Sequence, residues 1–187
     1  MSNYLIPLMV VVPMLCAILV NAFAKFNKSI KVLTFVVAIC LPIIPLLSNY
    51  GLHFFGGYTP MLDNATGVIY HPAITYAFDM LQQIFIAAVG LITFLVAFIY
   101  LSKYKKASGQ YLFLLFMGTA SVTALMLTDD IFNMFVFFEI LALVQVGIVI
   151  ASPMDYSYEM ALKYMILGSI GSPIMLLGIG FLLASTG

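Results

Sequence analysis

Two charged residues stand inside long apolar runs of this sequence. Glu139 lies in Phe135-Val-Phe-Phe-Glu-Ile-Leu-Ala, and Lys163 lies in Met160-Ala-Leu-Lys-Tyr-Met-Ile. A charge near the centre of a membrane span costs about 2.5–3.5 kcal/mol on insertion scales. Charged residues that remain there usually face a bundle interior or water and mark ion routes. Glu139 and Lys163 are therefore the candidate ion-pathway residues.

The chemistry of Glu139 and Lys163 admits more than one interpretation. Burial disfavours the charged form of either group, whereas an ion pair favours it, so making and breaking a pair would change the proton affinity of the lysine. That is the basis of a proton or ion relay. A static salt bridge or hydrogen-bonded contact between helices is the alternative. Lys163 could also extend to the membrane surface as an anchor.

The composition indicates whether the surface of this chain faces water or lipid. Of the 187 residues, 64% are hydrophobic and 7% are charged, whereas soluble domains carry about 25% charged residues. The formal net charge is zero and arginine is absent. Most of the chain must therefore contact lipid or other membrane helices. A soluble enzyme is excluded, and nucleic-acid binding, which needs clustered basic side chains, is not expected.

The elements that position the two charges are membrane helices. About 20 apolar residues cross a ~30 Å hydrocarbon core. The sequence predicts an all-α polytopic membrane protein whose single transmembrane domain covers 1–187. Its expected spans are roughly 4–24, 30–48, 80–101, 108–127, 131–151 and 158–184. We expect the long connection 49–79 to be turn-rich and non-helical, because it contains several glycines and prolines.

Spacing places the two charges at different depths. Glu139 is about 12 Å from the outer end of its span and about 18 Å from the inner end. Lys163 is about 8 Å above the inner end of the sixth span. The two spans should be antiparallel neighbours because their connection is short. A direct bond would have to bridge a difference in depth of roughly 10 Å, or contain water.

The lysines predict the orientation. Six of the seven lie in two connections, at positions 25, 28 and 31 and at positions 103, 105 and 106. The positive-inside rule puts both connections in the cytoplasm and both termini outside, in a cell membrane. The connection 152–157 carries Asp155 instead of lysine, which weakens this pattern slightly.

Acidic residues at span boundaries are secondary candidates. Asp79 opens the third span, where capping of the helix is the favoured role. Asp129 and Asp130 open the fifth span and admit the same interpretation. An acidic mouth that gathers cations is the alternative.

No cofactor, metal site or catalytic constellation is expected. Cys16 and Cys40 lie in apolar runs and are expected to be small core residues. His53 and His71 are 18 residues apart in the sequence, and no spacing brings them together as metal ligands. Asn64 begins a glycosylation sequon, a pattern that is common by chance. An enzymatic role remains uncertain, and a non-catalytic membrane subunit is favoured.

Three segments resemble the antiporter-like membrane subunits. The stretch from Asp129 to Ala142 resembles their glutamate-bearing fifth helix, and Ala161 to Ser169 resembles the start of their sixth helix. The loop and helix start within 55–81 are also similar. The family includes the D subunit of multisubunit Na⁺/H⁺ antiporters, the large membrane subunits of respiratory complex I and the matching subunits of membrane-bound hydrogenases.

The resemblance implies roles for both charged residues and for partners. Glu139 would be the membrane glutamate that pairs with a lysine, and Lys163 would match the lysine of the sixth helix. Family members have about fourteen helices, so this sequence corresponds to a form shortened to about the first six. A complete half-channel would then need another chain, such as a longer antiporter-like subunit.

Three hypotheses follow. The chain could be a subunit of a redox-driven or Na⁺/H⁺ antiport complex that contributes Glu139 and Lys163 to a proton or sodium pathway. It could be a structural spacer or adaptor in the same kind of complex. It could also be a small independent carrier that dimerises. The sequence does not identify the ion or the redox reaction.

Overall fold

The structure is a computed structural model that describes residues 5–48, 51–63, 67–104, 108–151 and 156–186. Asn64, Lys105, Lys106 and Asp155 lie outside the described residues. The described part contains six helices and two strands: α1 (Leu5–Ala22), α2 (Asn27–Leu46), β1 (Gly51–Asp63), β2 (Gly67–Phe78), α3 (Met80–Lys103), α4 (Gly109–Leu127), α5 (Ile131–Ile150) and α6 (Ser157–Thr186). All six helices are long and apolar enough to cross a membrane, as the sequence predicts. In lipid, a helix satisfies its backbone polar groups within one segment.

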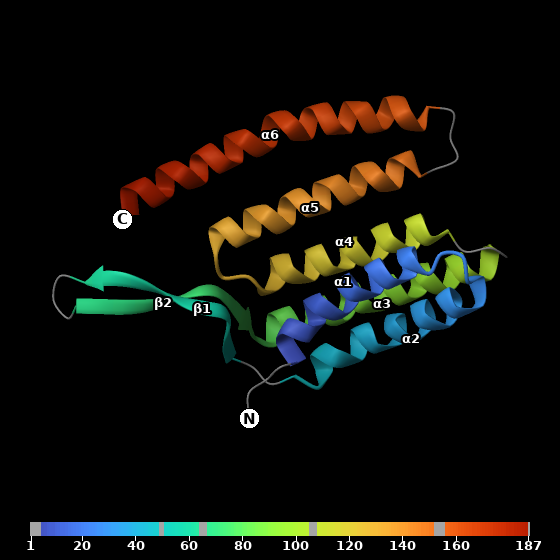
Figure 1. Cartoon of the computed structure of the whole chain (residues 1–187), viewed down its shortest axis with the longest axis horizontal. Coiled ribbons are helices and arrows are strands. Elements are labelled where there is room, and N and C mark those ends of the chain that lie inside the picture. Colours follow the sequence, from blue (N-terminus) through green and yellow to red (C-terminus); the bar gives the residue numbers. More distant parts are fainter. Residues whose placement is uncertain (1–4, 49–50, 64–66, 105–107, 152–155, 187) are drawn as a thin grey trace.

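The helices lie side by side, with α5 and α6 stacked on one edge of the group formed by α1 to α4 (Figure 1). Helices α1 to α4 pack against one another, α5 packs on α4, and α6 packs on α5 at the edge of the bundle. The hairpin, the start of α1 and the end of α6 lie at one end of the molecule, which we call the hairpin end. The ends of α1, α3 and α5 lie at the other end, near Lys28 and Lys103, which we call the lysine end. The helices therefore run alternately in opposite directions, as expected if the lysines that follow α1 and those that follow α3 lie on the same side of the membrane.

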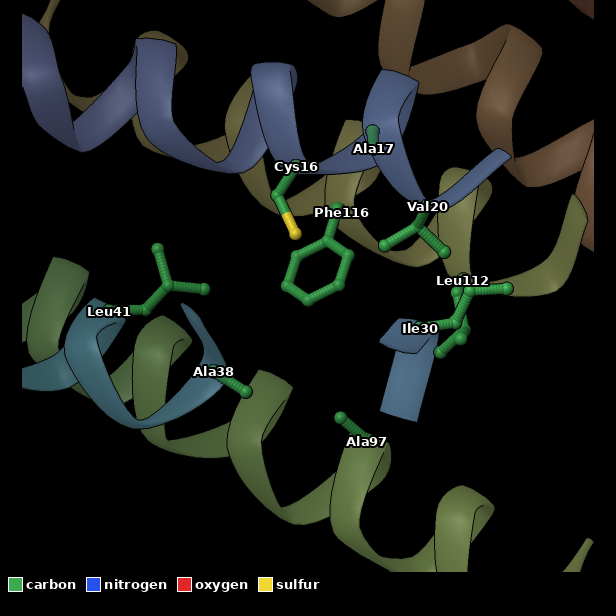
Figure 2. Close-up of a cluster of buried hydrophobic side chains, with 9 residues drawn as sticks. All are labelled: Cys16, Ala17, Val20, Ile30, Ala38, Leu41, Ala97, Leu112 and Phe116. Atoms are coloured by element: carbon green, nitrogen blue, oxygen red, sulfur yellow. The ribbon is translucent and has the colours of Figure 1, made fainter. Parts of the chain in front are cut away.

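The core lies among the first four helices. Phe116 of α4 is fully buried at its centre, with Cys16 of α1, Leu41 of α2 and Ala97 of α3 around it (Figure 2). The buried Cys16 agrees with its expected core role, whereas Cys40 is exposed. Two hydroxyl groups join α3 to α4 in this interior, because Thr93 Oγ1 lies 2.9 Å from Thr119 Oγ1. These four helices therefore form the packed core of the bundle. α5 packs on α4 outside this core, and α6 packs on α5.

Helix α2 stays close to α3 although it contains two prolines. The last carbonyls of a helix have no donor in a following helical turn, and a side chain of a neighbouring helix can donate to them. Gln83 of α3 donates its side-chain N–H to the Pro45 carbonyl oxygen at 3.1 Å. Gly90 allows the close approach: a Cβ atom there would lie 2.7 Å from the backbone nitrogen of Pro42.

The connection predicted as a non-helical loop contains an antiparallel hairpin. β1 pairs with β2 from Gly51 opposite Phe78 to Asp63 opposite Gly67, with an irregularity between Phe55 and Tyr58. This strand pair adds to the all-α architecture and was not predicted, because glycines and prolines are typical of turns rather than strands. Phe78 at its base is fully buried, which fixes the hairpin to the bundle.

Candidate functional site

Glu139 lies in the middle of α5 and is half-buried. It follows the start of the helix by eight residues, or about 12 Å. Within the part of the chain that the structure describes, its carboxylate makes no hydrogen bond or ion pair. An unpaired carboxylate at this depth is costly, so Glu139 remains the leading candidate for a functional residue.

The contacts of α5 with α4 show which side of the helix Glu139 occupies. Val144 packs close to Gly118 of α4, and Gly147 packs close to Leu114. Glu139 lies about 140° around the helix from Val144 and about 80° from Gly147, at ~100° per residue. Glu139 therefore lies at the flank of α5, beside the face that packs on α4, and α6 also packs on α5 (Figure 1).

Lys163 is paired within its own helix. Its Nζ lies 2.6 Å from Oε1 of Glu159, four residues earlier in α6. Both side chains are about 60% exposed. Glu159 is about 3 Å and Lys163 about 9 Å from the start of α6, so the pair lies near the lysine end of the bundle.

The packing of α6 separates Lys163 from Glu139. Ala161 and Ile179 are buried in α6, whose main neighbour is α5. Lys163 lies about 200° around the helix from Ala161, on nearly the opposite side. Lys163 thus points away from α5, the helix that carries Glu139. The two residues also differ in depth along the helices by about 8 Å. The described residues do not bring them together.

Glu159 is a charged residue that the sequence reasoning missed. A glutamate four residues before a lysine on a helix is the favourable orientation for an intrahelical ion pair. That spacing was visible in Glu159-Met-Ala-Leu-Lys163. An intrahelical pair also lowers the cost of placing both charges in a membrane span, since each partly compensates the other.

Of the three aspartates considered as supporting residues of an ion pathway, Asp79 and Asp130 lie directly before the first residue of a helix. The Asp130 carboxylate accepts hydrogen bonds from the backbone N–H groups of Phe132 (3.2 Å) and Asn133 (3.0 Å), so it caps α5. Asp79 is the residue before α3, and its backbone N–H donates to Gln82 Oε1 at 3.1 Å. Asp129 is exposed. All three lie at the hairpin end.

A polar contact ties the hairpin to the start of α5. The backbone of Tyr76 forms a bridge with Thr128, and the Asn133 side chain donates to Thr128 Oγ1 at 2.9 Å. Tyr76 is 5% exposed, and its burial raises the pKa of the phenol, while a hydrogen bond with Asn133 acts in the opposite direction. The helix that carries Glu139 is thereby held at the hairpin end of the bundle by a cap and by the hairpin.

Among the described residues, no group of three histidine, cysteine, aspartate or glutamate side chains is placed to hold a metal ion. The side chains of His53 and His71 are not among those described, so this expectation stays untested there.

Known proteins show what this arrangement is similar to. No protein-family model matches the chain. An uncharacterized protein of Methanocaldococcus jannaschii is 40% identical over 185 residues, which are 99% of this chain and 37% of that protein. The D subunit of the Na⁺/H⁺ antiporter of Bacillus subtilis is 32% identical over 101 residues, which are 54% of this chain and 20% of that protein.

A solved structure agrees with these sequence matches. A chain of the membrane-bound sulfane sulfur reductase, an archaeal respiratory membrane complex, superposes with a TM-score of 0.78 at 25% identity. The superposition covers 97% of this chain and 37% of that one. This chain thus spans little more than a third of the length of the proteins that it matches from end to end.

Proposed function

We propose that this chain, which is similar over nearly its whole length to subunits of Na⁺/H⁺ antiporters, is a membrane subunit of a multisubunit complex that translocates protons or sodium ions. In this proposal its lysine end faces the cytoplasm and both termini face outside, in the cell membrane. Redox chemistry or an ion gradient elsewhere in the complex supplies the energy.

The observation that carries the proposal is the unpaired carboxylate of Glu139 among the described residues. It is half-buried in the middle of an apolar span, at the flank of the α5 face that packs on α4. A carboxylate in such a place binds a proton or a small cation, because either one neutralises the charge that lipid disfavours. Glu139 is therefore the proposed site where the ion is held within the membrane.

Lys163 contributes to the same route from the other side of α6. Its ammonium group is held by Glu159 and faces away from α5. A proton on Glu139 can reach Lys163 only around or across α6, so water or another chain has to complete the path. A longer antiporter-like subunit beside α6 fits this need, and the exchange of Lys163 between Glu159 and a group on that subunit would change its proton affinity.

The test is Glu139→Gln in the assembled complex, which keeps the shape of the side chain and removes its charge. We expect ion transport per assembled complex to fall to background, because glutamine does not bind and release a proton. Asp129→Asn is the matched control, since it removes an exposed carboxylate just before α5, outside the apolar span, and leaves Glu139 intact. Its transport should fall less. Wild-type transport in a normally assembled Glu139→Gln complex would remove Glu139 from the route.

A second candidate function is a structural spacer or adaptor without a transport role. The exposed Glu159–Lys163 pair favours it, since a charged pair on an outward side of α6 can bind a polar group of a neighbouring subunit. This role predicts that Lys163→Ala lowers the yield of assembled complex and leaves transport per complex unchanged. Reduced transport at normal assembly would instead assign Lys163 to the ion route.

A further inference from the structure

A groove of about 660 Å³ opens at the lysine end of the bundle, between the end of α3, the start of α4 and the end of α5. It is separate from Glu139 and from the Glu159–Lys163 pair. Its volume lies within the range of about 300–1,000 Å³ that is usual for small-molecule sites. Its described lining includes Val96, Ile99 and Lys103 of α3, Tyr111 of α4 and Ile148 of α5.

The lining changes from apolar to polar along the membrane normal. Val96 and Ile99 lie about 10 Å and 6 Å from the end of α3, whereas Lys103, Ser108 and Ile148 of α5 lie close to helix ends. A molecule that fills the groove must therefore have an apolar part directed into the membrane and a polar part at its surface. A membrane lipid has this form.

Tyrosine rings give the groove a fixed wall. Tyr100 stacks on Tyr111 with ring centroids 4.3 Å apart, and its ring is 4.9 Å from that of Tyr104. The Tyr100 hydroxyl accepts a hydrogen bond from the backbone N–H of Ser108 at 2.9 Å. Tyrosines at the membrane surface have an apolar ring and a polar hydroxyl, which suits contact with both parts of a lipid.

The charge of the groove selects an anionic head group. Lys103 is the charged residue among the described lining residues, and its ammonium group lies 5.7 Å above the ring of Tyr104. Lys31 of α2 adds a second ammonium group nearby, because its Nζ donates to the backbone carbonyl oxygen of Tyr104 at 3.1 Å. No carboxylate is among the described lining residues to neutralise them.

We propose that this groove binds one anionic phospholipid, with the phosphate beside Lys103 and the first part of an acyl chain against Val96, Ile99 and Ile148. Basic pockets between membrane helices on the cytoplasmic side bind such head groups. The bound lipid fills the space between α3 and α5 and so supports the position of the helix that carries Glu139. The proposal does not depend on the ion route.

The probe is phosphatidylglycerol, compared with phosphatidylcholine of the same acyl chains. The full chain, purified in mild detergent with any subunits that accompany it, is titrated with each lipid, and bound lipid is counted by native mass spectrometry. We expect tighter binding of phosphatidylglycerol, and about fivefold weaker binding after Lys103→Ala, the usual effect of one lysine near an anionic surface. Lys28→Ala is the matched control, since Lys28 is exposed at the same end of the bundle and outside the groove.

A second variant tests the apolar part of the site. Val96→Trp places a larger side chain in the deep part of the groove and should displace phosphatidylglycerol while Lys103 remains. Equal binding of the two lipids, or equal losses in Lys103→Ala and Lys28→Ala, would overturn the proposal. Competition by inorganic phosphate as effective as that by the lipid would also overturn it, because it would mean a simple anion site. A protein segment from an accompanying subunit seated in the groove would do the same.

Discussion

Replacing Gly90 by alanine probes the close contact between α2 and α3. A Cβ atom at this position would lie 2.7 Å from the Pro42 nitrogen, 2.8 Å from the Leu41 carbonyl carbon and 2.9 Å from the Pro42 Cα. All three are backbone atoms, so no side-chain rotation relieves the contact. Normal carbon contacts are about 3.5–4.0 Å, and the two helices would have to separate locally by about 0.8 Å.

The expected cost follows from two opposing effects. Overpacking of a core costs about 1–3 kcal/mol, and a contact with backbone belongs in the upper part of that range. Alanine stabilises a helix by about 1 kcal/mol relative to glycine. The net loss of stability for Gly90→Ala is therefore about 2 kcal/mol, which corresponds to a melting temperature lower by about 4–8 °C in a chain of this size.

Thermal unfolding of the purified chain in detergent measures this loss, with Gly178→Ala as the matched control. A Cβ atom on Gly178 of α6 would meet no described atom within 4 Å, so that change should leave stability unaltered or raise it by up to about 1 kcal/mol. If Gly90→Ala melts at the same temperature as the wild type or as Gly178→Ala, the close packing of α2 on α3 is wrong.

Two further outcomes are expected. Asp130→Ala removes the side chain that accepts two backbone hydrogen bonds at the start of α5, and should destabilise the chain by about 1 kcal/mol, with Asp129→Ala nearly neutral in the same thermal assay. The raised pKa of Tyr76 means that the unfolded chain ionises first, near the ordinary value of 10.0, so stability is full below that pH and falls as pH rises through the folded pKa. Tyr76→Phe should reduce this alkaline loss in unfolding measured across that range, and an unchanged pH profile would contradict the role of burial.

Much of the architecture could be predicted from local patterns. Long apolar runs imply membrane helices, because lipid leaves a backbone few other ways to satisfy its polar groups. The position of Asp130 before an apolar run likewise indicated a helix start, and the structure places its carboxylate there as a cap. These features depend on residues that are close in sequence.

The strand pairing within 51–78 and the roles of the polar side chains were less predictable. β1 and β2 contain glycines and prolines, which local propensity assigns to turns. The contact of Asn133 with Thr128, and the bond from Gln83 to the Pro45 carbonyl, depend on which segments meet in space. Sequence spacing indicated only that amides in the spans would find partners.

The sequence by itself determined that this chain lies in a membrane, how many helices cross it, and that Glu139 and Lys163 carry charge within apolar spans. Only the tertiary structure decided which way those charges point. α6 is apolar around most of its circumference, and lipid tails are as apolar as a neighbouring helix, so no hydrophobic pattern marks the side that packs on α5. The burial of Ala161 and Ile179 identifies the side of α6 that packs on α5. Lys163 lies on nearly the opposite side, where it pairs with Glu159 and is directed away from Glu139.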